Sequence, residues 1–277
     1  MTMLMRAKPD PALVRTQAFL DAAAQRLRAP REGARGPLRF GVDLGTATIV
    51  IAAVDVAGQA VYWNFERARV VRDGVVVDFQ GAVEVVRRLK AAAEQALGLS
   101  VEEAATAHPP AIPASECRAC AFVLQQAGID CRRLVDEVGA ANAVLSVQDG
   151  AVVDVGGGST GVGVWRGGEL VRLDDVAGGG HHLDLILAGA LGIAVEAAEE
   201  RKRTQGDQVV QILRPGVERV AESIRRLCGG VDPGVVHLAG GALQLPGADA
   251  IVERYLGWPV QAWRHAELIT PFGIALS

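Results

Sequence analysis

The chain has 277 residues, half of them hydrophobic, with 33 glycines and a formal net charge of -4. This length suits one large or two small domains with a sizeable core, and the acidic balance argues against a nucleic-acid surface, which needs a basic footprint. The longest apolar stretch, residues 185–195, is too short to span a membrane, and no apolar signal segment follows the charged N-terminus, so we expect a cytoplasmic protein without a membrane partner.

Residues 1–37 are predicted to form an arm and a linker. The segment 9–27 has helical spacing, with Leu13, Leu20 and Leu27 near one face, and residues 28–37 are rich in Pro, Gly and Arg. We expect a solvated or loosely docked helix that contributes little to the core. The alternative is a helix that lays its apolar face into a groove of a partner.

The body begins at Leu38 with an apolar run that ends at Asp43, a glycine turn and an expected hairpin over 49–54 and 60–65. Residues 69–79 are interpreted as a loop. Helices are expected at 82–97, 115–127 and 139–146, and strands at 104–108 and 132–136. Cys117 and Cys120 form a C-x-x-C pair that would lie in the middle of the second of these helices, where we expect ordinary buried cysteines rather than zinc ligands.

The same unit recurs from about residue 149. An apolar run ends at Asp154, a glycine turn follows, and a hairpin is expected over 162–165 and 169–173. Further helices are expected at 182–191, 194–204, 217–227 and 248–256, and strands at 235–238 and near 260. The repeat indicates an internal duplication. We expect an α/β fold with two similar halves, 38–148 and 149–261, around a cleft, with 262–277 packing back on the first half.

The residue types in the two glycine turns favour phosphate chemistry. Glycines let backbone N–H groups wrap a phosphate, hydroxyls add donors, and a carboxylate holds Mg²⁺ through water. The candidate phosphate-binding residues are Gly45, Thr46, Ala47, Gly156, Gly157, Gly158, Ser159 and Thr160. Asp43 and Asp154 are the candidate outer-sphere Mg²⁺ residues, with simple turn capping as the alternative.

Glu137 is the candidate catalytic residue. It follows an expected strand and opens an expected helix, which would direct its side chain into the cleft to orient or deprotonate an attacking water. The alternative is an acid in the first turn of a helix, stabilised there by the helix dipole.

These motifs resemble those of the actin-like ATPase superfamily, which includes actin, MreB and the nucleotide-binding domain of DnaK-type chaperones. Residues 41–46 and 154–160 resemble its two phosphate loops, 137–141 its first connecting segment, and 238–242 its adenosine motif. Residues 70–79 together with 179–182 are similar to the EutJ family of ethanolamine utilization proteins. The resemblance implies a duplicated actin-like fold, related to ribonuclease H, around a nucleotide cleft.

The resemblance also implies site residues and cofactors. Gly179 and Gly180 would approach ribose or phosphate, and the adenosine would contact Gly240, Gly241 and Ala242. Glu199 and Lys202 would flank adenine, and the alternative for them is a surface ion pair on one helix face. The implied cofactors are ATP or ADP and Mg²⁺.

The function implied by the resemblance is that of a slowly hydrolysing ATP-binding protein. It would act as a chaperone or reactivation factor on a bacterial microcompartment enzyme or shell protein, and could be associated with the compartment. The alternatives are a filament-forming protein, a small-molecule kinase of the same superfamily, and a nucleotide-binding scaffold without turnover. The sequence departs from the superfamily at Val138 and Gly139, where relatives usually carry Pro and Thr.

Overall fold

Each half of the chain is built around a five-stranded mixed sheet in the computed structural model, which describes residues 10–72, 75–110 and 117–277. In the first sheet the order is β3-β2-β1-β6-β7, with β1 (Arg39–Leu44), β2 (Thr48–Val54), β3 (Ala60–Arg67), β6 (Glu103–His108) and β7 (Asp130–Asp136). In the second the order is β10-β9-β8-β11-β12, with β8 (Gly150–Val155), β9 (Ser159–Arg166), β10 (Glu169–Ala177), β11 (Val236–Ala239) and β12 (Val260–Gln261). The equivalent order of strands confirms an α/β fold made of two similar halves.

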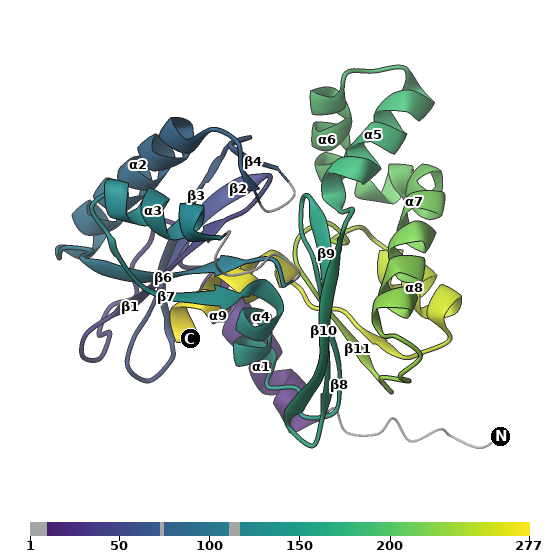
Figure 1. The fold of residues 1–277 in the computed structure, drawn as a ribbon, viewed down its shortest axis with the longest axis horizontal. Helices are drawn as coiled ribbons and strands as arrows, with labels where there is room; N and C mark the ends of the chain where they lie inside the picture. The colour runs from purple at the N-terminus through teal and green to yellow at the C-terminus, as the bar shows by residue number, and fades with distance from the viewer. Residues whose placement is uncertain (1–9, 73–74, 111–116) are drawn as a thin grey trace.

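Each sheet, together with the helices packed on it, forms one lobe of the molecule (Figure 1). The first lobe carries α2 (Phe79–Leu97), α3 (Arg118–Gln126) and α4 (Glu137–Leu145). The second carries α5 (Gly180–Leu191), α6 (Val195–Thr204), α7 (Gly206–Leu227) and α8 (Ala248–Leu256). A short 3-10 turn (Ala266–Leu268) leads into α9 (Ile269–Leu276), which packs on β1, β2 and α4.

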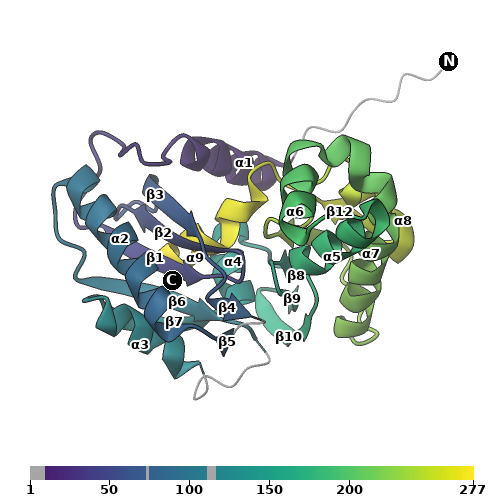
Figure 2. The ribbon, with the colours of Figure 1, turned by 90° about the horizontal axis from the view of Figure 1, so that it is seen from above.

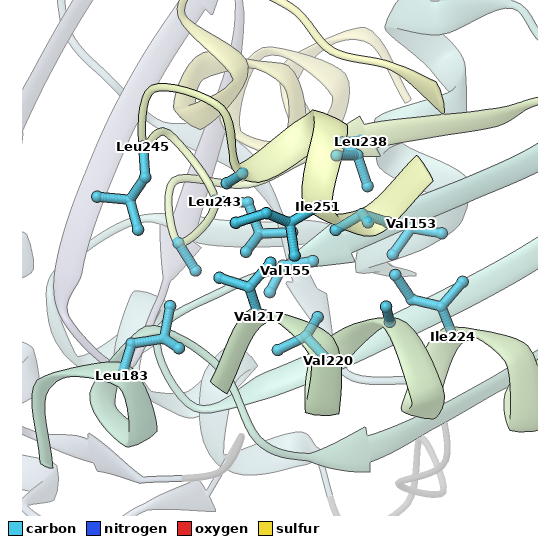
Figure 3. Close-up of a cluster of buried hydrophobic side chains, with 14 of the residues drawn as sticks. Val153, Val155, Leu183, Val217, Val220, Ile224, Leu238, Leu243, Leu245 and Ile251 are labelled. Atoms are coloured by element: carbon cyan, nitrogen blue, oxygen red, sulfur yellow. The ribbon is translucent and has the colours of Figure 1, made fainter. Parts of the chain in front are cut away.

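Three larger hydrophobic clusters hold the described residues together. One fills each lobe, and Figure 3 shows that of the second lobe, where side chains of α7 meet those of β8 and β11. The third lies between the lobes and includes Val138 of α4, Val152 of β8 and Phe272 of α9. At its centre α4 and α9 cross with their backbones in contact, because a methyl group on Gly273 would overlap the carbonyl of Ala140.

The described part of the arm, from Asp10 onward, packs on the body, so the expectation of a loosely docked helix is wrong. In α1 (Pro11–Ala24), Leu20 and Ala23 are fully buried in the cluster between the lobes. The ring of Phe19 meets Phe272 edge to face at 5.6 Å. The indole N–H of Trp63 donates to the carbonyl of Ala23 at 2.9 Å. Figure 2 shows α1 lying along the first lobe and reaching toward the second.

Backbone hydrogen bonds extend this docking beyond α1. Arg28 N–H donates to Trp63 O at 2.8 Å, and Arg31 N–H donates to Val61 O at 2.8 Å, so the chain after the helix pairs with the free edge of β3. The Arg31 guanidinium also pairs with Asp55, whose side chain is fully buried. Burial alone would raise the pKa of Asp55, but backbone N–H donors, including that of Gln59, and the charge of Arg31 bring it below its ordinary value.

Three local predictions need correction. The helix expected at 217–227 starts at Gly206 and contains Pro215, because the burial of Val209, Val210 and Leu213 favours the continuous helix despite the missing proline N–H. Cys117 is the N-cap of α3, not a mid-helix residue. Within 69–79, β4 (Val71–Arg72) and β5 (Val75–Val76) form a small two-stranded sheet rather than a loop. The start of the helix expected at 115–127 falls partly outside the described residues, and the part that is described begins at Arg118.

Among the described residues no single helix is long and apolar enough to cross a membrane. By length and composition alone, α5 and α6 pass such a test as a pair, which is bent by 104°.

Candidate nucleotide-binding site

The two glycine loops face each other across the gap between the lobes. Asp43 and Asp154 are the penultimate residues of β1 and β8, the central strands of the two sheets, and each strand leads into its loop. A methyl group built on Gly157 of the second loop would lie 3.2 Å from the Cβ of Ala47 and 3.4 Å from the Cβ of Thr46. The fold therefore brings the two predicted phosphate loops into van der Waals reach.

Three carboxylates share the space behind these loops. Burial, with a contribution from the charge of Asp154, raises the pKa of Asp43 to about 7. Burial also raises the pKa of Asp154 to about 6, against the effect of the Thr270 hydroxyl, which donates to it at 2.6 Å. Burial and the charges of Asp154 and Asp43 raise the pKa of Glu137, the first residue of α4, well above its ordinary value. No Lys or Arg of the described residues forms an ion pair with these three acids.

This cluster fits a hydrated divalent cation. Like charges in a low-dielectric space are stabilised by a positive ion between them. The described residues hold no group of three or more His, Cys, Asp or Glu side chains placed to bind a metal directly. Mg²⁺ keeps several of its waters in proteins, so Asp43 and Asp154 could hold it through water without such a group.

The carboxylate cluster predicts an unusual pH dependence of stability in the absence of metal. The folded-state pKa of Asp43, about 7, lies above the ordinary value of 3.8, so the folded state binds more protons between these pH values. Asp43 therefore contributes fully to the free energy of unfolding below pH 4, and this contribution is lost as pH rises toward 7. We expect the melting temperature in EDTA to fall from pH 5 to pH 7.5, and Asp43→Asn to flatten that fall. The exposed control Asp207→Asn should retain it; equal slopes in Asp43→Asn and wild type would contradict the assignment.

Backbone hydrogen bonds fix the second loop against the start of α5. Gly180 N–H donates to Gly156 O at 2.9 Å, and Gly178 N–H donates to Gly158 O at 2.8 Å. The hydroxyl of Thr160 is buried and donates to Gly178 O at 2.7 Å, so we assign Thr160 to supporting the loop from behind. Ser159, the first residue of β9, follows the loop and is partly exposed. Gly179 lies so close to the loop that a side chain on it would overlap the carbonyl of Gly156.

The predicted adenosine residues meet on the second lobe. Lys202 of α6 is buried, with its Nζ 2.7 Å from Asp184 Oδ1 and donating to Gly180 O at 2.8 Å. A methyl group on Gly180 would lie 3.4 Å from the Cβ of Ala242, so α5, α6 and the loop after β11 converge here. Glu199 does not pair with Lys202; its carboxylate pairs instead with Arg69 of the first lobe. The alternative of a Glu199–Lys202 surface pair is therefore wrong.

The loop after β11 also approaches the carboxylates. Gly240 has a φ of +81°, and a side chain on it would overlap Asp154 Oδ1 and the carbonyl of Val155. A glycine is therefore required for the close approach to Asp154, independently of any nucleotide. Gly241 is exposed beside Glu267.

Thr270 is a site residue that the sequence analysis missed. Its hydroxyl comes from α9, at the far end of the chain, and orients Asp154. The signal available in the sequence was a single hydroxyl residue in an otherwise apolar segment. Such a hydroxyl requires a hydrogen-bond partner when it is buried, as Thr270 is.

The departures at Val138 and Gly139 have local explanations. Val138 is fully buried against β9, where a methyl group on Gly161 would lie 2.7 Å from its Cγ2. Valine thus fills space that the glycine leaves open. Gly139 N–H donates at 2.6 Å to Asp136, the N-cap of α4. The helix start that positions Glu137 is therefore well defined without Pro and Thr.

Comparisons with known proteins agree with this architecture. A family model of MreB/Mbl protein matches residues 53–191, and one of cell division protein FtsA matches residues 151–272. The chain is 14% identical to MreB5 of Spiroplasma citri bound to ADP, with a TM-score of 0.70 over 85% of this chain and 94% of that one. This likeness shows the actin-like fold.

More similar relatives match most of the chain. Ethanolamine utilization protein EutJ of Salmonella typhimurium is 38% identical over 242 residues, which cover 87% of this chain and 86% of that protein. The crystal structure of EutJ from Carboxydothermus hydrogenoformans is 37% identical, with a TM-score of 0.90 over 95% of this chain and 98% of that one. The chain belongs to the EutJ family of ethanolamine utilization proteins, within the actin-like ATPase superfamily.

Proposed function

We propose that this protein binds ATP and ADP with Mg²⁺ between its lobes and hydrolyses ATP slowly. The observation that carries the proposal is the meeting of two Asp-bearing glycine loops, with Thr46 and Ala47 in reach of Gly157. The relative from Spiroplasma citri, solved with ADP, supports a nucleotide in this fold. Asp43 and Asp154 would hold the ion, and the loop N–H groups would bind the phosphates.

The site supports phosphoryl transfer to water by position and charge. Bound Mg²⁺ would neutralise charge on the phosphates, which is most of what this chemistry requires. Glu137 would orient or deprotonate the water. Burial and the charges of Asp154 and Asp43 raise the pKa of Glu137, which favours a proton-accepting role over that of a permanently charged surface acid.

Titration calorimetry tests the binding proposal directly. ATP and ADP should bind with Mg²⁺ and much more weakly in EDTA. A nucleotide concentration about a thousandfold above its Kd should stabilise the fold by about 4 kcal/mol. Failure of both nucleotides to bind with Mg²⁺ would refute the proposal.

Replacing Glu137 separates binding from turnover. Glu137→Ala is expected to keep ATP affinity within about twofold and to slow hydrolysis about 100-fold, because a general base acts mainly in the transition state. Phosphate release and calorimetry on the same sample give the two values. Glu102→Ala, an exposed glutamate just before β6, serves as the control. Hydrolysis at the wild-type rate in Glu137→Ala would contradict the catalytic role and favour the alternative, an acid stabilised by the helix dipole in the first turn of α4.

We further propose that the protein acts as a chaperone or reactivation factor for enzymes of a bacterial microcompartment, in the cytoplasm or on the compartment. Membership of the EutJ family supports this setting. The purified protein should co-sediment with purified ethanolamine-utilization compartments, more with ATP than with ADP. Sedimentation that is absent in both nucleotide states would count against the partner.

A further inference from the structure

An arginine of the first lobe reaches the second lobe at the mouth of the site. Arg69 follows β3, and its Nη1 lies 2.8 Å from Glu196 Oε1 while its Nη2 lies 3.4 Å from Glu199 Oε2, both on α6. Among the ion pairs of the described residues, only those of Arg69 join a residue of 38–148 to a residue of 149–261. The lobes are therefore connected by charge at a point away from their packed core.

The first-lobe end of this connection is held firmly. Ala68 N–H donates to Ala47 O at 3.3 Å, and Ala47 belongs to the first phosphate loop. On the other side of Arg69, the carbonyl of Val70 accepts from Val77 N–H at 2.8 Å. The backbone that carries Arg69 is thus fixed on both sides, and one of its attachments is the loop itself.

The second-lobe end leads to the other loop. Glu199 lies one turn before Lys202 on α6, and Lys202 donates to the carbonyl of Gly180. Gly180 N–H in turn donates to Gly156 of the second phosphate loop. In Figure 1, α6 and β4 lie on the upper side of the gap between the lobes, and α4 and α9 lie on the lower side. The ion pairs of Arg69 therefore connect the two phosphate loops through α6, on the side of the molecule opposite the crossing of α4 and α9.

We infer that Arg69 is a latch between the lobes, whose pairs with Glu196 and Glu199 restrain opening and slow the entry and release of nucleotide. The effect on nucleotide rests on the function proposed above, whereas the restraint on opening does not. Exposed ion pairs are individually weak and are screened by salt. The interaction of one guanidinium with two carboxylates is stronger than a single ion pair but still breaks readily. This contact can therefore restrain the lobes without holding them permanently together.

The first experiment measures opening without nucleotide. Spin labels on Gln95→Cys in α2 and Gln211→Cys in α7, in a Cys131→Ser background, report the distance between the lobes. Arg69→Ala should lengthen and broaden the distance distribution, and 0.5 M salt should do the same to the wild type. Arg88→Ala is the matched control, because Arg88 is 56% exposed against 57% for Arg69 and pairs with Glu66 inside the first lobe. Identical distributions for Arg69→Ala, Arg88→Ala and wild type would overturn the latch.

The second experiment measures release of a fluorescent ADP analogue with Mg²⁺. Arg69→Ala should release it roughly three- to tenfold faster, as expected for the loss of about one or two weak ion pairs. Arg69→Glu should be faster still, and Arg69→Glu with Glu196→Arg should recover part of the difference. Release at the wild-type rate in both Arg69 variants would refute the nucleotide effect. If no nucleotide binds to the wild type, the function proposed above fails, while the distance measurement still decides the latch.

Discussion

Replacing Asp43 with alanine is expected to weaken Mg²⁺-dependent ATP binding about 100-fold, the upper end of what outer-shell metal partners contribute. The same change should stabilise the protein without metal, because it removes one of three buried acids that repel one another. Asp154→Ala should weaken binding to a similar extent. It should stabilise less, since it leaves the buried Thr270 hydroxyl without its acceptor. Calorimetry with Mg²⁺ and melting curves in EDTA give both quantities.

The opposite signs of these two effects make the test specific to a cation site. Thr270→Val removes the hydroxyl but keeps the three acids, so it should weaken Mg²⁺-dependent binding much less than Asp154→Ala. Asp207→Ala, far from the carboxylates in sequence and exposed, should change neither quantity. An Asp43→Ala protein that binds Mg·ATP as the wild type does would refute the metal assignment and leave turn capping as the role of Asp43.

Truncating one arm side chain is expected to cost a large share of the stability. Leu20→Ala should lower the free energy of unfolding by about 3 kcal/mol, because Leu20 is fully buried in the cluster between the lobes, to which Phe272 also belongs. This corresponds to a fall of roughly 6–10 °C in Tm for a chain of this size. Denaturant unfolding measures the change, and Val14→Ala on the same helix, where Val14 is 50% exposed, is the control.

Deleting residues 1–37 extends this prediction. The deletion would uncover Phe272 and the edge of β3, so we expect lower solubility and a much lower melting temperature. A shortened protein that melts within a few degrees of the full chain, or a Leu20→Ala change below about 0.5 kcal/mol, would show that the arm is dispensable and return it to a partner-docking role.

Local patterns were sufficient to predict where the two Asp-bearing loops of the candidate site lie in the fold. The apolar runs ending at Asp43 and Asp154, each followed by a glycine turn and a hairpin, specified the equivalent strands of both sheets and the position of the loops. Strand and turn signals of this kind depend on near neighbours in the sequence. Glu137 was likewise placed at the start of a helix after a strand, where the structure has it.

Contacts between distant segments could not be predicted in this way. Thr270 lies 116 positions from Asp154, and Arg69 lies more than a hundred from Glu196, so no periodicity links them. The arm was misjudged because a Pro- and Gly-rich linker predicts irregular structure, yet its backbone can still pair with the open edge of β3. The helix expected at 217–227 was predicted too short for a related reason, since tertiary burial outweighed the local effect of Pro215.

The crossing of α4 and α9 restricts how the two halves of a duplicated gene can diverge. These helices follow β7 and β12, the equivalent edge strands of the two sheets. Where two side chains touch, a larger residue on one side is accommodated by a smaller one on the other. Gly273 instead meets the main chain of Ala140, and no substitution can make a carbonyl smaller. Side chains on the outer helices of either lobe can therefore change in size together with their neighbours, whereas any side chain at position 273 would overlap the main chain of α4.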